Sequence, residues 1–522
     1  MDTKALRQKI LDLAIRGKLV PQDPNDEPAS VLLERIRAEK QQMVKDGKLK
    51  AKDIKNDTVI FKGDDNLHYE QFADGTVKCI EDEIPFELPD GWAWARLGNI
   101  GEIITGGTPS KSHHEYYGNA FPFFKPADLD QGRKTIISSE YLSEKGKSCC
   151  RIIPKFSTAV CCIGSIGKCG YLNVEGTTNQ QINSVIPNID SLYAYYYCSS
   201  DYFLEQLISL ASATTIAIVN KSKMESVLIP VPPMAEQQRI ANTLDTELGL
   251  IATLEVEKSD IIVAINNVKS KILDLAIRGK LVPQDPNDEP ASVLLERIRA
   301  EKEELIKQGK IKRDKKESVI FKGDDNSYYE KIGDEITCID DFLSFDIPDT
   351  WTWTRLKNIG DVIGGGTPKT NNHNYWDGEI PWVTPADLSG YKNMYIAHGS
   401  RFITELGLKE SSAQLLPKDS VLFSSRAPIG YIAIAENAIA TNQGFKSVSP
   451  YISGISEYLY FCLKRCTDDI IQRASGTTFK EISGSEMSET LVPIPSLNEQ
   501  KKIVNRISDL FAVINNVEAS LN

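Results

Sequence analysis

A segment of 32 residues occurs twice in this chain of 522 residues, and the two copies are identical. The sequence KILDLAIRGKLVPQDPNDEPASVLLERIRAEK runs from Lys9 to Lys40 and again from Lys271 to Lys302. Packing tolerates many substitutions that preserve volume and pattern, so identity that includes the polar residues is more than a fold requires. We therefore expect both copies to face the same partner.

The repeat extends over the whole chain. VIFKGDDN at Val59 recurs at Val319, GWAWARLGNIGEIITGGTP at Gly91 corresponds to TWTWTRLKNIGDVIGGGTP at Thr350, and LIPVPPMAEQQRI at Leu228 corresponds to LVPIPSLNEQKKI at Leu491. The offset between the copies stays between 259 and 263 residues. Two such periods account for the full length, so the chain consists of two related halves.

One boundary makes the repeat circular. The segment 236–278 is predicted to be one long helix, whereas its counterpart is split between residues 499–522 and residues 1–16. The chain could be opened at either of two equivalent places and keep the same architecture. Its ends are therefore expected to lie near each other.

The long segment carries a heptad pattern, which is typical of coiled coils. The stripe comprises Leu244, Glu247, Ile251, Leu254, Lys258, Ile261, Ile265, Val268, Ile272 and Leu275, and its counterparts are Ile507, Leu510, Ile514, Val517, Leu521, Leu6, Ile10 and Leu13. We expect the two stripes to pack as an antiparallel coiled coil, with Glu247 and Lys258 interrupting the seam. The alternative is that each helix packs only on its own domain.

Helix-stop signals follow in each copy. Gly17 and Gly279 lie where a helix should end, and the turn-rich PQDPNDEP comes next. A second amphipathic helix is predicted at about residues 28–45 and 290–307. The polar stretch after it, rich in Lys, Asp and Gly, is interpreted as a loosely structured linker.

The two remaining blocks have diverged. Short apolar runs and frequent turn residues predict that strands dominate residues 90–235 and 349–498, with a helix near LYAYYYCSSDYFLEQLISL. Trp92, Trp94, Trp351 and Trp353 alternate along a presumed strand and are expected in the core rather than as base-stacking platforms. One molecule thus contains identical arms and dissimilar domains, which suits a device that holds two copies of one partner while reading two different things.

The net charge of −12 at first argues against nucleic-acid binding. Residues 91–235 contain 12 basic and 11 acidic residues, and residues 350–498 contain 13 and 14, so the whole charge lies outside these nearly neutral blocks. Any DNA surface is therefore expected to be built locally within them.

The cysteines fit a reducing compartment. Ten Cys residues, no secretory pattern and no apolar run near the roughly 18 residues of a membrane span predict a cytoplasmic chain. Cys149, Cys150, Cys161, Cys162 and Cys169 crowd together without the spacing of zinc ligands. We expect buried or partly buried free thiols there and no metal site.

Polar loops at similar places in the two diverged blocks offer chemistry for binding DNA. Glycines permit close backbone approach, hydroxyls and lysines suit phosphates, and amides can pair bidentately with adenine. The candidate DNA-binding residues are Thr105, Gly106, Gly107, Thr108, Lys111, Lys125, Lys168, Asn179, Gln180, Gln181, Thr214, Thr215, Lys221, Gly365, Gly366, Thr367, Lys369, Arg426, Asn442, Gln443, Lys446, Thr477, Thr478 and Lys480. Arg426 and Lys168 are predicted to occupy similar places, and the candidate partner-binding residues are Leu13, Ile15, Leu275 and Ile277.

Each of these motifs is weak alone. GGGTP lacks the strand-then-helix context of a dinucleotide fold, and GSIGK lacks the full P-loop spacing. A turn or capping role is the ordinary alternative for any single Asn or Thr. The pattern across both blocks is stronger than its parts.

The chain also resembles a known family. IPFELPDGWAWARLGNIGEIITGGTPS, FFKPADL, TTNQ, SATT and LIPVPPMAEQQRI, with their second set, resemble the specificity subunit of type I restriction-modification enzymes over essentially the whole chain. The resemblance implies an α+β chain with two α/β target recognition domains, separated by two long helices that form an antiparallel coiled coil in a circular pseudo-twofold repeat. The match is less direct at Gln181, which aligns with Gly444.

The resemblance and the repeat together predict the domain boundaries. Residues 1–20 form the N-terminal part of a split spacer helix, 21–89 a helical arm and linker, 90–235 the first target recognition domain, 236–282 the central spacer helix, 283–348 the second arm and linker, 349–498 the second target recognition domain, and 499–522 the C-terminal part of the split helix.

The resemblance also implies a function. Each recognition domain would read one half of a bipartite, gapped site on double-stranded DNA, and the helices would dock two methyltransferase subunits to direct adenine methylation and, with restriction subunits, cleavage. The specificity subunit has no catalytic activity and no cofactor, and S-adenosylmethionine, ATP and Mg are expected in the partner subunits. Consistent with this, the sequence contains no NPPF or DPPY tetrapeptide and no complete Walker A motif.

Two other classes of function remain as alternatives. One is a self-contained methyltransferase or nuclease with a built-in recognition domain, which the missing motifs disfavour. The other is a scaffold that binds two identical proteins without DNA.

Overall fold

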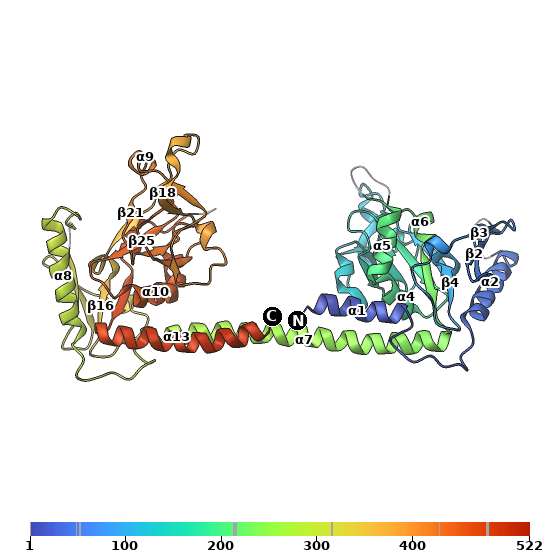
Figure 1. Ribbon diagram of the computed structural model, residues 1–522, viewed down its shortest axis with the longest axis horizontal. Coiled ribbons are helices and arrows are strands. Elements are labelled where there is room, and N and C mark those ends of the chain that lie inside the picture. The colour runs from blue at the N-terminus through green and yellow to red at the C-terminus, as the bar shows by residue number, and fades with distance from the viewer. Residues whose placement is uncertain are drawn as a thin grey trace. The chain divides into compact units, whose positions relative to one another are not determined.

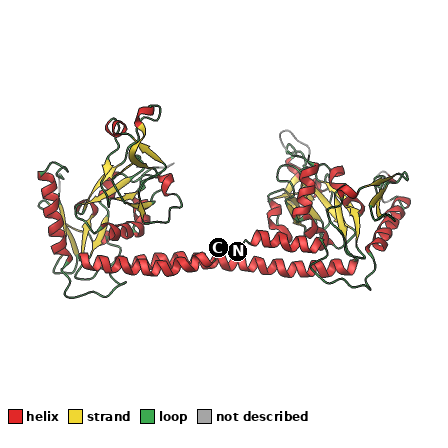
Figure 2. Ribbon diagram, viewed as in Figure 1, coloured by secondary structure: helices red, strands yellow, loops and turns green. Residues whose placement is uncertain are grey.

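The computed structural model describes residues 2–47, 50–51, 54–211, 217–314, 317–426, 428–476 and 480–521. It divides into two compact units, Met1–Lys258 and Ser259–Asn522. Helix α7 (Met234–Ile277) begins in the first unit and ends in the second (Figure 1), which confirms the predicted long helix. Each unit combines helices with short strands (Figure 2), so the mixed α and β class is also confirmed.

The first unit consists of a helical arm, a small sheet and a larger domain of strands. Its helices before α7 are α1 (Thr3–Ile15), α2 (Ala29–Lys45), α3 (Glu144–Lys147), α4 (Ser191–Cys198), α5 (Asp201–Leu210) and α6 (Lys221–Glu225). Its strands are β1 (Val59–Lys62), β2 (His68–Gln71), β3 (Val77–Cys79), β4 (Ala93–Arg96), β5 (Gly101–Thr105), β6 (Tyr117–Phe124), β7 (Glu140–Leu142), β8 (Thr158–Cys161), β9 (Cys169–Tyr171), β10 (Thr177–Thr178), β11 (Ile182–Pro187) and β12 (Leu228–Val231). They form the sheets β1-β2-β3, β10-β6-β7, β5-β11-β8-β9 and β12-β4.

The second unit repeats this plan. Its helices after α7 are α8 (Ala291–Lys307), α9 (Glu405–Lys409), α10 (Ser456–Arg465), α11 (Thr467–Arg473), α12 (Gly484–Ser488) and α13 (Leu497–Ser520). Its strands are β13 (Ser318–Lys322), β14 (Tyr328–Ile332), β15 (Glu335–Cys338), β16 (Thr352–Arg355), β17 (Gly360–Gly364), β18 (Trp376–Val383), β19 (Tyr395–Ile396), β20 (Arg401–Ile403), β21 (Leu415–Leu416), β22 (Val421–Phe423), β23 (Ile432–Ala435), β24 (Ile439–Thr441), β25 (Lys446–Pro450) and β26 (Leu491–Ile494). The sheets are β13-β14-β15, β16-β26, β17-β25-β22-β23-β19 and β20-β18-β24-β21.

The cores of the two domains contain the alternating tryptophans. Trp92, Trp94, Trp351 and Trp353 are between 3% and 9% exposed, so their predicted place in the core is confirmed. The aromatic segment after residue 190 forms the two short helices α4 and α5 rather than one.

Among its described residues, the polar stretch after each arm helix contains strands from Val59 and from Ser318, which the interpretation as a loose linker did not anticipate. It forms the three-stranded antiparallel sheets β1-β2-β3 and β13-β14-β15. The Asp and Gly residues that suggested a linker lie in the tight turns of these sheets. At Gly63 an added Cβ would lie 2.8 Å from Asp65 Oδ1 and 2.9 Å from Tyr69 Cε2, so a larger residue there would displace these two side chains.

Glycines end the first helix of each duplicated segment, as predicted. Gly17 has φ +64° and Gly279 has φ +65°, a conformation that residues with a Cβ rarely adopt. A Cβ at either position would also lie 2.4 Å from the Cγ atom of a proline, Pro89 or Pro348. Both positions therefore require glycine.

The loop after each glycine is fastened to the first turn of a long helix. Gln22 Nε2 donates to Glu236 Oε1 at 3.1 Å on α7, and Gln284 Nε2 donates to Glu499 Oε1 at 2.9 Å on α13. Glu236 and Glu499 are only 1% and 3% exposed. Hydrogen bonds in such low-dielectric surroundings are stronger than in water, so each bond anchors the duplicated segment to its own unit.

The glutamine after each of these glutamates holds the helix to the recognition domain. Gln237 Nε2 donates to Pro232 O at 2.8 Å, and its Oε1 accepts from Asp190 N at 2.9 Å. In the second unit Gln500 Nε2 donates to Pro495 O at 3.1 Å. The repeated motif thus contains Glu and Gln side by side because the Glu bonds to the duplicated segment and the Gln bonds to the recognition domain.

The shorter helices lie along α7 within their own units (Figure 1). Arg7 on α1 pairs with Glu255 at 2.9 Å, and Lys269 on α7 pairs with Glu518 on α13 at 2.7 Å. The apolar contacts of these helices with their units include Leu11, Ala14, Ile240 and Leu244 in the first unit and Ile272, Ala276, Ile503 and Ile507 in the second. The cross-helix ion pair is therefore repeated at corresponding positions.

The predicted heptad stripe is buried only in part. Its buried members on α7, at most 7% exposed, are Leu244, Ile251, Ile265 and Ile272. Its exposed apolar members on α7, between 41% and 48% exposed, are Leu254, Ile261 and Val268. The stripe therefore does not form one continuous buried seam within either unit.

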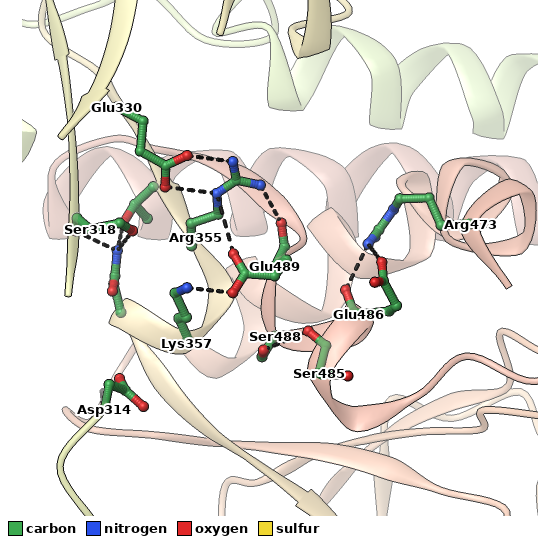
Figure 3. A network of polar contacts seen from close by, with 12 residues as sticks. Asp314, Ser318, Glu330, Arg355, Lys357, Arg473, Ser485, Glu486, Ser488 and Glu489 are labelled. Carbon is green, nitrogen blue, oxygen red and sulfur yellow. Dashed lines mark hydrogen bonds and ion pairs between the residues drawn. The ribbon is translucent and has the colours of Figure 1, made fainter. Parts of the chain in front are cut away.

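An arginine joins the small sheet to the recognition domain in each unit. Arg355 donates from Nε and Nη2 to the two carboxylate oxygens of Glu330, at 3.0 and 2.6 Å, and from Nη1 to Glu489 O at 2.8 Å (Figure 3). Arg96 binds Glu70 in the same bidentate way, at 3.0 and 2.7 Å. The glutamate side chains are 7% and 5% exposed, so each desolvated charge depends on its arginine.

Arg96→Ala removes the partner of a buried carboxylate, so it is expected to destabilise the docking of the first small sheet by about 3 kcal/mol. Hydrogen exchange of the amides of β1, β2 and β3 should then become roughly a hundredfold faster. The equivalent sheet β13-β14-β15 of the same variant is the control and should keep its exchange rates. Unchanged exchange in the first sheet would show that the ion pair does not hold it.

Candidate nucleic-acid interface

Two loops meet at one edge of the main sheet in each recognition domain. The glycine loop is residues 106–109 in the first unit and 365–368 in the second, and the amide loop is residues 179–181 and 442–444. In the first unit β5 and β11 are antiparallel neighbours, with Thr105 opposite Asn183. The end of one strand and the start of the other therefore bring the two loops together.

The approach of the loops in the first unit requires a glycine. A Cβ on Gly106 would lie 2.3 Å from the carbonyl oxygens of both Thr178 and Asn179. Gly107 N donates to Thr178 O at 2.9 Å, but an added Cβ at Gly107 meets no described atom within 4 Å. Only the first glycine of the pair is thus required by close contact.

Side chains at the tips of the loops are also paired. Thr108 Oγ1 donates to Gln180 Oε1, and both residues are exposed. This bond uses the oxygen of the Gln180 amide, so its NH2 group is left to donate to an acceptor outside the protein. Asn179 is 7% exposed and exchanges two hydrogen bonds with Gln181, at 3.0 and 3.1 Å. Asn179 therefore shapes the loop, and its contact with DNA stays a prediction.

The second unit builds the same loop pair, but there an added Cβ on the second glycine, Gly366, would also lie 2.1 Å from Ala413 N. A Cβ on Gly365 would lie 1.9 Å from Asn442 O, and Thr367 Oγ1 donates to Gln443 Oε1. Asn442 Oδ1 accepts from Gly444 N at 2.9 Å, so Asn442 also has a turn role. The two units share this loop pair although the domains around it differ.

The surface beside the amide loop is different in the two units. An isolated β-bridge joins Ile163 to Ile218 in the first unit and Arg426 to Glu481 in the second. The residue before the bridge, Cys162 or Ser425, donates its N–H to the carbonyl oxygen of the last amide-loop residue, Gln181 or Gly444, at 2.7 Å in both units. Ile218 is 41% exposed, and the side chains of Arg426 and Glu481 are 37% and 39% exposed. One unit thus presents an apolar pair where the other presents an ion pair.

Arg426 and Lys168 are not equivalent, so the prediction that they occupy similar places is wrong. Arg426 corresponds to Ile163, because each forms the isolated β-bridge of its unit. Lys168 corresponds to Tyr431, because the carbonyl oxygen of each accepts the equivalent backbone hydrogen bond at 2.8 Å. The prediction matched charge instead of register. Glu481 was missed for the same reason, although the offset of 263 residues that relates β12 to β26 would have aligned it with an isoleucine.

Several of the predicted cations are held in ion pairs. These pairs are Lys125 with Glu140 at 2.6 Å, Lys168 with Asp130 at 2.7 Å, Lys221 with Glu225 at 3.5 Å, and Glu481 with both Arg426 at 3.5 Å and Lys446 at 3.6 Å. Lys111, Lys369 and Lys480 are exposed. Thr214, Thr215, Thr477 and Thr478 lie outside the described residues. A phosphate would therefore compete with carboxylates for some of these cations.

Two of the predicted partner-binding side chains lie inside the protein. Ile15 and Ile277 are each 2% exposed and belong to the hydrophobic cores of their units. Leu13 and Leu275 are half-buried. Their position at the last turn of a helix packs the two isoleucines against their own domain, and partner binding by them stays a prediction.

The thiols and the described helices bear on two other predictions. Cys161 and Cys162 are buried and Cys150 and Cys169 are half-buried, but Cys149 is exposed, contrary to expectation. Within the described ranges, no cluster of three or more His, Cys, Asp or Glu side chains is placed to hold a metal ion. None of the described helices is long and apolar enough to cross a membrane.

Comparison with known proteins identifies the family. Residues 89–267 and 348–522 match the model of the type I restriction modification DNA specificity domain. The chain therefore belongs to this family, as a non-catalytic specificity subunit that serves DNA recognition. Both matched segments contain one glycine loop and one amide loop.

Individual relatives agree with this assignment. The specificity subunit of the type I restriction enzyme MjaIX from Methanocaldococcus jannaschii is 45% identical over 172 residues, which cover 33% of this chain and 40%, less than half, of that protein. The specificity subunit of the Escherichia coli type I restriction enzyme EcoAI is 27% identical over 590 residues, which cover 99% of this chain and 90% of that one. A solved structure described under complex assembly and conformational transition of the type I R-M system has a TM-score of 0.53 at 18% identity, over 84% of this chain and 94% of that chain, so the fold is shared.

Gly106→Ala is expected to weaken DNA binding by the assembled complex by about tenfold or more, because the new Cβ would displace the amide loop. Gly107→Ala is the matched control and should bind as the wild type does. Titration of DNA that carries the recognised site, at one fixed salt concentration, measures both affinities. Equal affinities for the two variants would contradict a role for the close approach.

Proposed function

We propose that each unit reads one half of a bipartite, gapped DNA site, and that the chain holds two methyltransferase subunits in a cytoplasmic complex that also recruits restriction subunits. The observation that carries the proposal is one loop pair repeated among different neighbours. A chain that read a single continuous site would not need two such domains. A scaffold without DNA would not need two diverged surfaces around a common loop pair.

The common loop pair suits the sequence-independent part of DNA binding. The glycines and the Thr–Gln pair recur in both units, and a contact that both units make cannot distinguish two half-sites. The NH2 groups of Gln180 and Gln443 are therefore assigned to phosphate oxygens. Phosphate contacts fix the register of a protein on DNA without carrying sequence information.

The neighbouring pairs suit the reading of bases. In the major groove an apolar side chain contacts the thymine methyl group, whereas Arg pairs with guanine and Glu accepts from cytosine. The Ile163–Ile218 pair thus favours an A·T pair in the first half-site, and the Arg426–Glu481 pair favours a G·C pair in the second. Because Arg426 and Glu481 lie 3.5 Å apart, they would separate or share one base pair when DNA binds.

The long helices are proposed to form the antiparallel coiled coil and to dock the methyltransferase subunits. Apolar residues are exposed at corresponding positions in the two units, namely Leu6, Leu250 and Leu254 at 37%, 57% and 46%, and Val268, Val513 and Val517 at 48%, 64% and 47%. Exposed apolar patches of this kind mark interaction sites. Their repetition supports one partner bound twice, at these residues instead of at the buried Ile15 and Ile277.

The chemistry would reside in the partners. S-adenosylmethionine would belong to the methyltransferase subunits, and ATP and Mg to the restriction subunits. This chain would contribute selection of the site and placement of the enzymes upon it.

Replacing residues 90–235 with another domain of the same family tests the modular reading. Base-resolved methylomes of cells that express the chain with its methyltransferase subunit should show one half of the gapped motif changed and the other intact. The reciprocal exchange of residues 349–498 is the matched control and should change the other half. Alteration of both halves by one exchange, or of neither, would contradict the proposal.

Arg426→Ala tests the assignment of base contacts. Discrimination at one base pair of the second half-site should fall by about 1–3 kcal/mol, so the methylated motif becomes degenerate at that position only. Gln443→Ala on the adjacent loop is the control and should lower methylation of all sites without altering the motif. A change in the first half-site after Arg426→Ala would overturn the assignment.

A further inference from the structure

The small sheet of the first unit has one apolar face that its own unit does not use. Residues directly opposite each other in antiparallel strands share a face. On this outer face the rows are Phe61–Tyr69–Cys79 and Val59–Gln71–Val77. Phe61 and Val77 are 41% and 52% exposed, and Cys79 is exposed as well.

The second unit repeats the outer face. Its rows are Phe321–Tyr329–Cys338 and Val319–Lys331–Ile336. Val319, Phe321 and Ile336 are 40%, 39% and 55% exposed. The Phe and Tyr rings are stacked with their centroids 5.9 Å apart in both units. Both outer faces thus present a preformed aromatic pair of the kind that is enriched at interfaces.

The opposite face of each sheet does the internal packing. Ile320 and Glu330 on that inner face are each 6% exposed, and Glu70 in the first unit is 4% exposed. The inner face is therefore buried at its Ile and Glu positions, whereas the outer face leaves several apolar side chains in water, which is unusual unless another molecule covers them. The same pattern in both units indicates one partner bound twice.

Acidic turns surround the outer faces, although the second face itself also carries the exposed Lys331. They carry Asp64, Asp65 and Asp74 in the first unit and Asp324, Asp325, Asp334 and Glu335 in the second, all exposed. The hydroxyl of Tyr69 donates to Asp65 at 2.7 Å and lowers the pKa of that carboxyl. Tyr329 does the same for Asp325. Carboxylates that stay ionised repel DNA phosphates and favour a protein surface bearing Lys or Arg.

The arginines that join each small sheet to its recognition domain bear on which protein would dock there. Because Arg96 and Arg355 join each small sheet to its recognition domain by bidentate ion pairs, a partner on the outer face is held in register with one half-site. Register matters most for the enzyme that must place its active site on a base, since small displacements cost catalytic rate.

We propose that the outer face of each small sheet docks one methyltransferase subunit, through a complementary surface that is apolar at its centre and basic at its rim. This inference rests on the function proposed above and adds a second contact to the one assigned to the long helices.

Cysteine protection tests the proposal on the unaltered chain. Cys79 and Cys338 lie on the outer faces, and Cys149 is an exposed thiol outside them. N-ethylmaleimide labelling followed by peptide mapping should show Cys79 and Cys338 protected in the complex with two methyltransferase subunits, while Cys149 still reacts. Unprotected Cys79 and Cys338 in that complex, equal protection of Cys149, or protection only when restriction subunits are added would each overturn it. A chain that bound no methyltransferase subunit would overturn the proposed docking function as well.

Matched variants give a second readout. Phe61→Ser with Val77→Ser should reduce the complex from two methyltransferase subunits to one by native mass spectrometry, and Phe321→Ser with Ile336→Ser should do the same from the other unit. Ile137→Ser, at a residue that is 67% exposed in the first recognition domain, is the control and should leave two. Hydrogen exchange of the small sheets should match the wild type, which separates lost docking from unfolding. Two subunits retained by both double variants would overturn the proposal.

Discussion

A buried hydrogen bond between the duplicated segment and the first turn of a long helix fixes the plan of each unit. Gln22 donates to Glu236 in the first unit, and Gln284 donates to Glu499 in the second. The second oxygen of Glu236 accepts from Trp92 Nε1 at 3.1 Å, so the same carboxylate also holds the recognition domain. The duplicated segment and the recognition domain are therefore both hydrogen-bonded to one carboxylate on α7. Its burial leaves little freedom to exchange the residues around it, which accounts for part of the identity between the duplicated segments.

Each recognition domain combines a loop pair that both units share with neighbouring residues that differ between the units. The glycine and amide loops are held by backbone contacts that only glycine permits, so they recur in both units. Next to them Ile163 and Ile218 stand where Arg426 and Glu481 stand in the other unit. Such a layout allows the chemistry of a surface to change at a few positions without disturbing the loops or the junction with the helices.

Much of the fold could be predicted from the sequence because its signals are local. The periodicity of α7, the glycines that end the first helices and the alternating tryptophans all report on nearby residues. The small sheets were missed because their strands are short and the Asp and Gly residues of their tight turns were taken for a linker, although each strand pairs with the next one along the chain. The candidate site was half predicted: the loops were found, but Arg426 was matched with Lys168 by charge, and Glu481 was overlooked although the 263-residue offset aligns it with Ile218.

The junction where the duplicated segment, a long helix and the recognition domain meet occurs once in each unit. The two junctions share the Gln–Glu bond but differ in their other hydrogen bonds. In the first unit Trp92 Nε1 donates to Glu236, whereas among the described residues Trp351 Nε1 and Gln500 Oε1 at the second junction have no hydrogen-bond partner. A buried polar group left unpaired costs about 1–3 kcal/mol. The second junction therefore lacks the tryptophan hydrogen bond of the first, and its other polar contacts with the duplicated segment come instead from Asn498 and Lys502, which bind Asp288 at 2.6 and 3.4 Å. Two copies of one duplicated segment are thus fastened to their units by different sets of side chains.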